Sequence, residues 1–199
     1  MLIGCYVSSL VIDALCKQAV EENAAVACFY FDFADQQEQF PDAILGSVLK
    51  QVVGGLGEVP GRIARAFRDQ GKVIGGQRLQ LEEIMEFLQD IASSRPTFVC
   101  FDALDEYPAR HRAKLLDLLS QILRNSPGVR LFLTGRPHIL GEVEKHFTGR
   151  TATRAIAPTK NDIITFLRAK LKEDTMPDAM NQSLEEEIMN NIPETVSDV

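Results

Sequence analysis

Hydrophobic positions along the chain follow two periods, one typical of buried strands and one typical of helices. Residues 97–101 are an almost unbroken apolar run, and residues 24–33 and 129–134 are rich in β-forming side chains. Unbroken apolar runs are typical of strands that are covered on both faces, as in a parallel sheet. Between these runs, apolar residues recur every three or four positions, which indicates amphipathic helices. This order predicts an α/β fold with a doubly wound, mainly parallel sheet.

Helical spacing and capping residues place the helices between and after the strands. They are predicted over about 8–22, 41–54, 79–93, 108–125, 139–146, 159–171 and 183–192. Ser8 or Ser9 is expected to cap the first helix. Ser183, with Glu186 three residues later, is expected to open the last one as a capping box. Residues 151–157 are expected to form a weak strand.

The strand predicted at 97–101 runs directly into three carboxylates, Asp102, Asp105 and Glu106. The carboxyl ends of parallel strands border the crevice in which ligands bind, and a carboxylate there can hold Mg²⁺ directly or through water. We interpret Asp102 as the magnesium-orienting acid of a Walker B segment. Asp105 or Glu106 can then polarise an attacking water on the γ-phosphate side. The alternative is that the acids only begin the next helix, where carboxylates complement the helix dipole.

The strand predicted at 129–134 also ends in polar chemistry. Arg136 can reach a phosphate with a forked pair of hydrogen bonds, and Thr134 can orient a phosphate or a water. Because both strand ends are expected at one edge of the sheet, the two groups together indicate a site more specifically than either alone. As an alternative, Arg136 is a solvated or ion-paired side chain in a turn that Pro137 fixes.

Composition narrows the possible partners. With 199 residues, 45% of them hydrophobic, the chain can bury the core of one domain. A formal charge of −7 leaves no chain-wide basic footprint for nucleic acid or an anionic membrane. The four cysteines form no C-x-x-C pair, and the N-terminus has neither the basic region of a signal peptide nor a membrane span. We therefore expect a cytoplasmic protein that binds neither nucleic acid nor membrane.

A phosphate loop cannot be found in the sequence. Residues 52–62 contain several glycines, but they follow a predicted helix rather than a strand and lack the Lys-Ser/Thr pair of a P-loop. Gly71-Lys72 fails the same test because Val73 follows it. Both segments are expected to be helix ends and loops.

Four segments taken together resemble a known family: SSLVIDAL, YFDF, FDALDE and LTGRP. They resemble the NACHT-type signal-transduction P-loop NTPases, and within them the nephrocystin-like N-terminal domain of fungal NLR-like proteins. The resemblance extends from about residue 8 to the end and is loosest after Arg150. It implies a switch operated by ATP or GTP with Mg²⁺, in which nucleotide state controls self-association and the release of an attached effector.

Residue by residue, the resemblance implies roles at the two strand ends. Asp102 matches the family's magnesium acid, Asp105 and Glu106 its paired acids, and Arg136 its sensor arginine. Gly135 stands where the family often has Ser.

The chain departs from the family at the phosphate loop. Alignment on SSLVIDAL puts Gly4 at the position of the loop lysine and Cys5 at the position of its hydroxyl. Because the lysine and the loop's N–H groups bind the phosphates, we expect little or no NTP hydrolysis by this chain. The alternative is a non-catalytic interaction module that keeps the fold without nucleotide.

The missing phosphate loop also affects how much of the family's sheet this chain is expected to contain. The family's strand before the loop is an interior strand, so the sheet is expected to be incomplete there unless residues 1–7 form part of it. A truncated or mis-spliced gene product, or a fragment of a larger chain, is the expected reason. We expect an NTPase core over 1–157 and the start of a C-terminal helical subdomain over 158–199.

Overall fold

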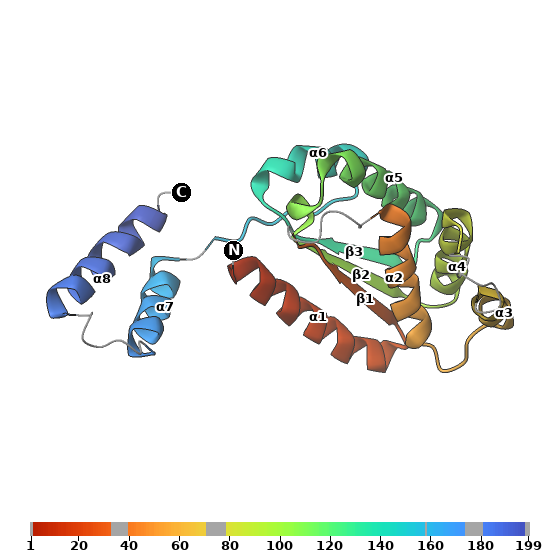
Figure 1. Ribbon diagram of the computed structural model, residues 1–199, viewed down its shortest axis with the longest axis horizontal. Coiled ribbons are helices and arrows are strands. Elements are labelled where there is room, and N and C mark those ends of the chain that lie inside the picture. Colours follow the sequence, from red (N-terminus) through yellow and green to blue (C-terminus); the bar gives the residue numbers. More distant parts are fainter. Residues whose placement is uncertain (1, 33–39, 71–78, 158, 174–180, 198–199) are drawn as a thin grey trace. The chain divides into compact units, whose positions relative to one another are not determined.

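The computed structural model describes residues 2–32, 40–70, 79–157, 159–173 and 181–197 (Figure 1). The chain divides into two compact units, Met1–Thr151 and Ala152–Val199. The sequence placed the boundary after residue 157, a little later than this division. That the second unit begins a larger helical subdomain stays a prediction.

A parallel sheet forms the centre of the first unit. Its strands are β1 (Ala25–Tyr30), β2 (Thr97–Asp102) and β3 (Val129–Leu133), in the order β1-β2-β3. Both neighbouring pairs are parallel, and Thr97 of the central strand is in register with Ala25 and with Val129. The predicted parallel α/β fold is therefore confirmed.

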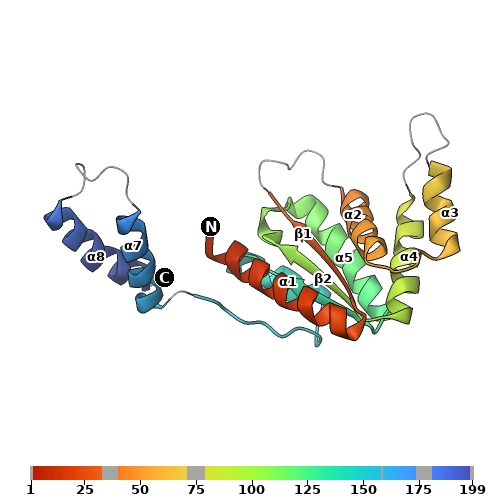
Figure 2. The ribbon, with the colours of Figure 1, turned by 90° about the horizontal axis from the view of Figure 1, so that it is seen from below.

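Helices cover both faces of this sheet. The first unit contains α1 (Leu2–Glu22), α2 (Pro41–Gly54), α3 (Gly61–Gln70), α4 (Leu81–Ser94), α5 (Ala109–Asn125) and α6 (Leu140–His146), with short 3-10 helices η2 (Leu104–Glu106) and η3 (Pro137–Ile139). Helix α1 packs on one face, against β1 and β2, while α2, α4 and α5 lie on the other (Figures 1 and 2). This is the doubly wound arrangement that the order of elements predicts.

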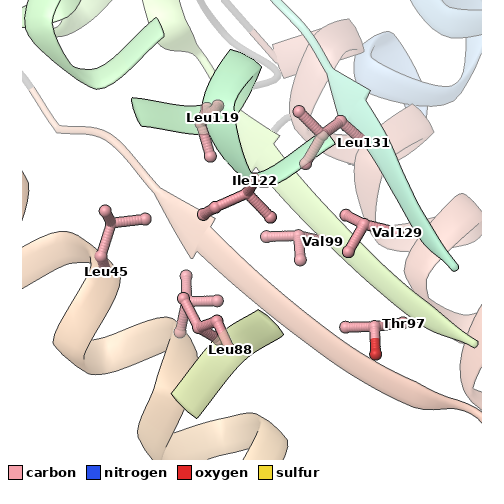
Figure 3. A pocket seen from close by; sticks show the side chains of 9 residues that line it. Leu45, Leu88, Thr97, Val99, Leu119, Ile122, Val129 and Leu131 are labelled. Carbon is pink, nitrogen blue, oxygen red and sulfur yellow. The ribbon is translucent and has the colours of Figure 1, made fainter. Parts of the chain in front are cut away.

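The core lies between the sheet and the layer of α2, α4 and α5. Leu45 and Leu49 of α2 and Leu115 and Leu119 of α5 are fully buried there. A cavity of about 10 Å³ remains between aliphatic side chains of these helices and the sheet (Figure 3). Because the space is no larger than a single water needs and its walls are mainly apolar, it is a packing defect rather than a ligand site.

Several sequence expectations are wrong in the first unit and the segment after it. Helix α1 begins at Leu2, so residues 2–7 do not supply a strand, and Ser8 lies inside the helix rather than at its cap. The glycine-rich segment 52–62 contains the end of α2 and a loop, as expected, but the sequence analysis did not predict helix α3, which begins at Gly61. Residues 151–157 form no strand. Gly71-Lys72 lies outside the described residues.

The second unit contains a pair of helices, α7 (Lys160–Lys172) and α8 (Gln182–Ser197), which pack against each other. Thr159 and Asp162 form a capping box at the start of α7. The predicted cap at Ser183 is wrong, because the N–H of Leu184 donates to the side-chain oxygen of Asn181 at 2.9 Å. Asn181 caps α8 two residues earlier than expected.

Candidate functional site

Asp102 lies at the carboxyl end of the central strand, on the face that α1 covers. It is 5% exposed. Its Oδ1 accepts a hydrogen bond from the hydroxyl of Ser8 in α1 and another from Thr134 Oγ1 at 2.5 Å. Because hydroxyl donors from two other elements meet this oxygen, the buried carboxylate is satisfied within the protein and joins α1, β2 and the end of β3.

Thr134 fastens the tips of β2 and β3 together. Its Oγ1 accepts a hydrogen bond from the N–H of Ala103 at 3.0 Å. Its own N–H donates to the carbonyl of Phe101 at 2.9 Å, and its carbonyl accepts from the N–H of Leu104 at 2.9 Å. The two strand ends therefore lie together at one edge of the sheet, and the Thr134 hydroxyl both donates and accepts there.

The residue after Asp102 has an unusual backbone. Ala103 has a φ of 55°, in the left-handed region that a side chain with a Cβ disfavours by roughly 1–2 kcal/mol. This conformation turns the chain sharply from β2 into η2, which contains Asp105 and Glu106. Backbone strain of this kind clusters at functional sites.

Asp105 holds the predicted sensor arginine. Its Oδ2 lies 3.4 Å from Arg136 Nε, and its Oδ1 accepts the backbone N–H of Arg136 at 3.2 Å. The Asp105 side chain is nearly buried, whereas that of Arg136 is 63% exposed. The alternative of an ion-paired arginine in a turn thus describes this arrangement. Helix α5 begins only at Ala109, so Asp105 does not cap it.

Gly135 allows the turn before Arg136 to close. A Cβ at this position would lie 2.6 Å from Cδ1 of Ile139 and 3.4 Å from Asp105 Oδ1. A serine at this position would require Ile139 to move.

A buried arginine that the sequence analysis missed, Arg112, donates hydrogen bonds to the residue after the acidic turn and to α6. Arg112 of α5 is 7% exposed, and its Nη1 donates to the carbonyl of Tyr107 at 2.8 Å. Its Nε donates to Glu142 of α6 at 2.8 Å. The signal was available, because Arg112 precedes the buried Leu115 and Leu116 by three and four positions and so shares their face.

Tyr107 closes the turn on its other side. Its ring stacks on Phe31 with centroids 4.7 Å apart, and burial raises the pKa of its phenol above the usual range. The phenol is therefore neutral at physiological pH and serves as part of the core.

Few groups that could bind phosphate or metal accompany these acids. The positions expected for the phosphate-loop lysine and hydroxyl, Gly4 and Cys5, belong to helix α1. In the described part of the chain, no group of three or more His, Cys, Asp or Glu side chains could hold a metal ion. Asp102 supplies one carboxylate, and its Oδ1 already accepts hydrogen bonds from Ser8 and Thr134. Such a group fits Mg²⁺ mainly through water.

Comparison with known families identifies the class of protein. Residues 5–136 match the family model described as Nephrocystin 3, N-terminal. The match spans more than half of the chain, so the chain belongs to this family, as the resemblance predicted.

Comparison with solved and curated proteins adds little. The structure of the Walker-type ATPase paby2304 of Pyrococcus abyssi has a TM-score of 0.43 and 13% sequence identity. The alignment covers 92% of this chain and 63% of that chain. None of the curated proteins compared with the chain matches it.

Within the ranges described, no helix is both long and apolar enough to span a bilayer.

Proposed function

We propose that the chain is the nucleotide-binding core of an ATP- or GTP-operated signalling switch of NACHT type, with weak nucleotide binding and little or no hydrolysis of its own. The observation that carries the proposal is the group at the carboxyl edge: buried Asp102, the Thr134 hydroxyl 2.5 Å from it, and the Asp105–Arg136 pair on the adjoining turn. In a larger protein, nucleotide at this edge would control self-association and an attached effector.

The residues at this edge take distinct roles in the proposal. Asp102 would hold Mg²⁺ through water, because its carboxylate is a hard oxygen donor. Bound Mg²⁺ would neutralise phosphate charge. Arg136 binds a phosphate after leaving Asp105, while Thr134 orients a phosphate or a water. Asp105, once released, or Glu106 polarises the attacking water.

The proposed weakness also follows from the geometry. Asp102 Oδ1 already accepts two hydroxyl hydrogen bonds, and the Arg136 guanidinium is already paired. A ligand must displace these contacts without a lysine at the position of Gly4. We therefore expect a dissociation constant of about 1 mM or weaker for a magnesium-bound nucleotide.

The same contacts favour a second candidate function. A carboxylate that protein hydroxyls satisfy needs no cation to remain buried. A non-catalytic interaction module that keeps the fold without nucleotide would have this arrangement permanently.

Titration with fluorescent ATP and GTP analogues, with and without Mg²⁺, separates the two functions. We expect weak, Mg²⁺-dependent binding that Asp102→Asn and Arg136→Ala each reduce. Asp13→Asn is the matched control, because Asp13 is an exposed carboxylate of α1 that pairs only with Lys17 among the contacts described. No binding at about 10 mM nucleotide, ten times the expected constant, or binding that Asp102→Asn leaves unchanged, would support the interaction module instead.

A further inference from the structure

Helix α6 lies beside α5 (Figure 1) and is attached by apolar side chains mainly at its two ends. Each of its seven residues is at least partly exposed, and Val143 packs against the core while only partly buried. The buried residues Ile139 and Phe147 lie just before and just after the helix. Because α6 buries so little along its length, polar contacts decide how firmly it stays on α5.

Two polar contacts join α6 to α5. Glu142 Oε2 accepts a hydrogen bond from Arg112 Nε at 2.8 Å, and His146 Nδ1 lies 3.0 Å from Asp117 Oδ1. The side chains of Arg112 and Glu142 are 9% and 27% exposed, whereas that of Asp117 is 58% exposed. Since solvent weakens exposed charge pairs, the contact between Glu142 and Arg112 is the stronger attachment.

Arg112 holds the acidic turn with the same guanidinium. Its Nη1 donates to the carbonyl of Tyr107 at 2.8 Å and makes a longer contact of 3.4 Å with the carbonyl of Asp105. One buried side chain is therefore shared between the turn and α6. Because the donors of a guanidinium lie in one rigid plane, a shift of the partner on one side changes the geometry on the other.

A second connection joins the acidic turn to α6 through the backbone. Asp105 accepts the N–H of Arg136 at 3.2 Å and pairs with its Nε at 3.4 Å. Arg136 directly precedes η3, and α6 follows η3 without a break. The packing of Gly135 against Ile139 leaves no room for a Cβ between them, so this start of η3 is closely fitted. The contacts thus close a ring that runs from Asp105 through Arg136, η3 and α6 to Arg112 and back to the turn; we call it the contact ring.

We propose that the contact ring makes α6 a conformational element that responds to the pairing of Asp105 with Arg136. When the side chain and the N–H of Arg136 leave Asp105, η3 loses its attachment to the turn, the contact between Glu142 and Arg112 weakens, and α6 loosens from α5. Coupling between two sites is reciprocal, so loosening of α6 also favours release of Arg136. An anion that takes Arg136 from Asp105 would therefore change α6 as well.

The contact ring is built from protein groups alone. The coupling therefore goes beyond the proposed function and holds whether or not nucleotide binds. It also leaves out the other aspartate of the strand end, because Asp102 is held by Ser8 and Thr134. Variants at Ser8 and at Asp105 consequently release different aspartates, and only the second is expected to affect α6.

Hydrogen exchange of single backbone amides, followed by NMR in the whole chain, tests the coupling in the forward direction. The N–H of Phe147 reports on α6, because it donates to the carbonyl of Val143 at 3.1 Å in the last turn. Asp105→Ala, which removes both contacts with Arg136, should accelerate exchange at Phe147 by about threefold or more. The rate is taken relative to the N–H of Ala25, which donates to the carbonyl of Pro96 at the start of the sheet.

Ser8→Ala is the matched control and should leave the relative rate at Phe147 unchanged. An unchanged rate at Phe147 in Asp105→Ala, or an equal rise in Ser8→Ala, would overturn the proposal.

A second pair of variants tests the reverse direction and keeps Asp105 in place, so it decides the question even where Asp105→Ala does not fold. Glu142→Gln and Asp117→Asn each remove one negative charge from a contact of α6 and keep the shape of the side chain. Glu142→Gln should accelerate exchange of the N–H of Arg136, which donates to Asp105, by about threefold or more relative to Ala25. Asp117→Asn should leave the rate at Arg136 unchanged. Equal effects of the two variants at Arg136, or no effect of Glu142→Gln, would contradict the coupling.

Discussion

Two aspartates at one strand end, the buried Asp102 and Asp105 with its nearly buried side chain, are held in opposite ways. Neutral hydroxyl groups of Ser8 and Thr134 hold Asp102. Asp105 holds an exposed arginine, Arg136, through a side-chain ion pair and a backbone hydrogen bond. The first arrangement joins three elements of the fold, whereas the second fastens one side chain to the surface.

This difference indicates the order in which the site can open. An ion pair with one exposed partner contributes little to stability, so Arg136 can leave Asp105 at small cost. Freeing Asp102 requires α1 or the end of β3 to give up a buried hydrogen bond, which costs more. A phosphate would therefore meet the arginine first, and a cation would reach Asp102 only after the hydroxyls yield.

The largest expected effect on stability is that of Arg112, whose hydrogen bonds hold the turn that contains Asp105. Arg112→Ala should lower the free energy of unfolding by about 3 kcal/mol, because it leaves Glu142 and the carbonyl of Tyr107 without their donor. Urea denaturation followed by circular dichroism measures the change. Arg110→Ala, at an exposed site of the same helix, is the control and should change stability by less than about 0.5 kcal/mol. Equal effects would show that Arg112 does not fix the turn.

Thr134→Val tests how much one of the two hydroxyl groups that hold Asp102 contributes to stability. The change keeps the shape of the side chain but removes the hydroxyl that serves both Asp102 and the N–H of Ala103. We expect a loss of about 2 kcal/mol in the same denaturation experiment. Thr97→Val removes a buried hydroxyl with one hydrogen bond, to the carbonyl of Arg95 at 3.3 Å, and should cost less. A larger loss for Thr97→Val would place the main hydroxyl contribution elsewhere.

Ser8→Ala isolates the attachment of α1. Leu10 and Val20 of this helix are 69% and 86% exposed, so apolar burial supports the helix weakly on its outer side. Removing the bond to Asp102 should cost about 1 kcal/mol and accelerate hydrogen exchange in α1. Leu10→Ala, at the exposed position of the same helix, should leave exchange unchanged. If both variants exchange alike, Ser8 does not hold the helix.

Arg136→Ala is expected to have the smallest effect. Because the side chain is 63% exposed, its loss should change the free energy of unfolding by less than about 0.5 kcal/mol. If Arg136→Ala lowered the free energy of unfolding as much as Thr134→Val, the contacts of Asp105 would contribute as much to stability as those of Asp102, which would contradict the comparison.

Local signals made most of the fold predictable. Pro41 and Gly54 marked both ends of α2, and the apolar run before Asp102 marked the central strand. The parallel order then placed Asp102 and Thr134 at one edge. These predictions succeeded because each depended on neighbouring residues or on a general rule of sheet topology.

The missed features depend on contacts between distant residues. Ser8 and Asp102 are 94 positions apart, and Ser8 matched a local capping pattern equally well. Arg112 was visible as a polar residue on an apolar face, but its partners, Tyr107 after η2 and Glu142 of α6, were not. The expected strand at 151–157 failed because, among the residues that the structure describes, no strand pairs with its β-forming residues.

Competition between Ser8 and a cation for Asp102 is the central claim, and isothermal titration with magnesium-bound ATP tests it most directly. Ser8→Ala should bind about fivefold more tightly than the unaltered chain, the equivalent of one hydrogen bond of about 1 kcal/mol, and Asp102→Asn should abolish the gain. Equal or weaker binding by Ser8→Ala would contradict the claim.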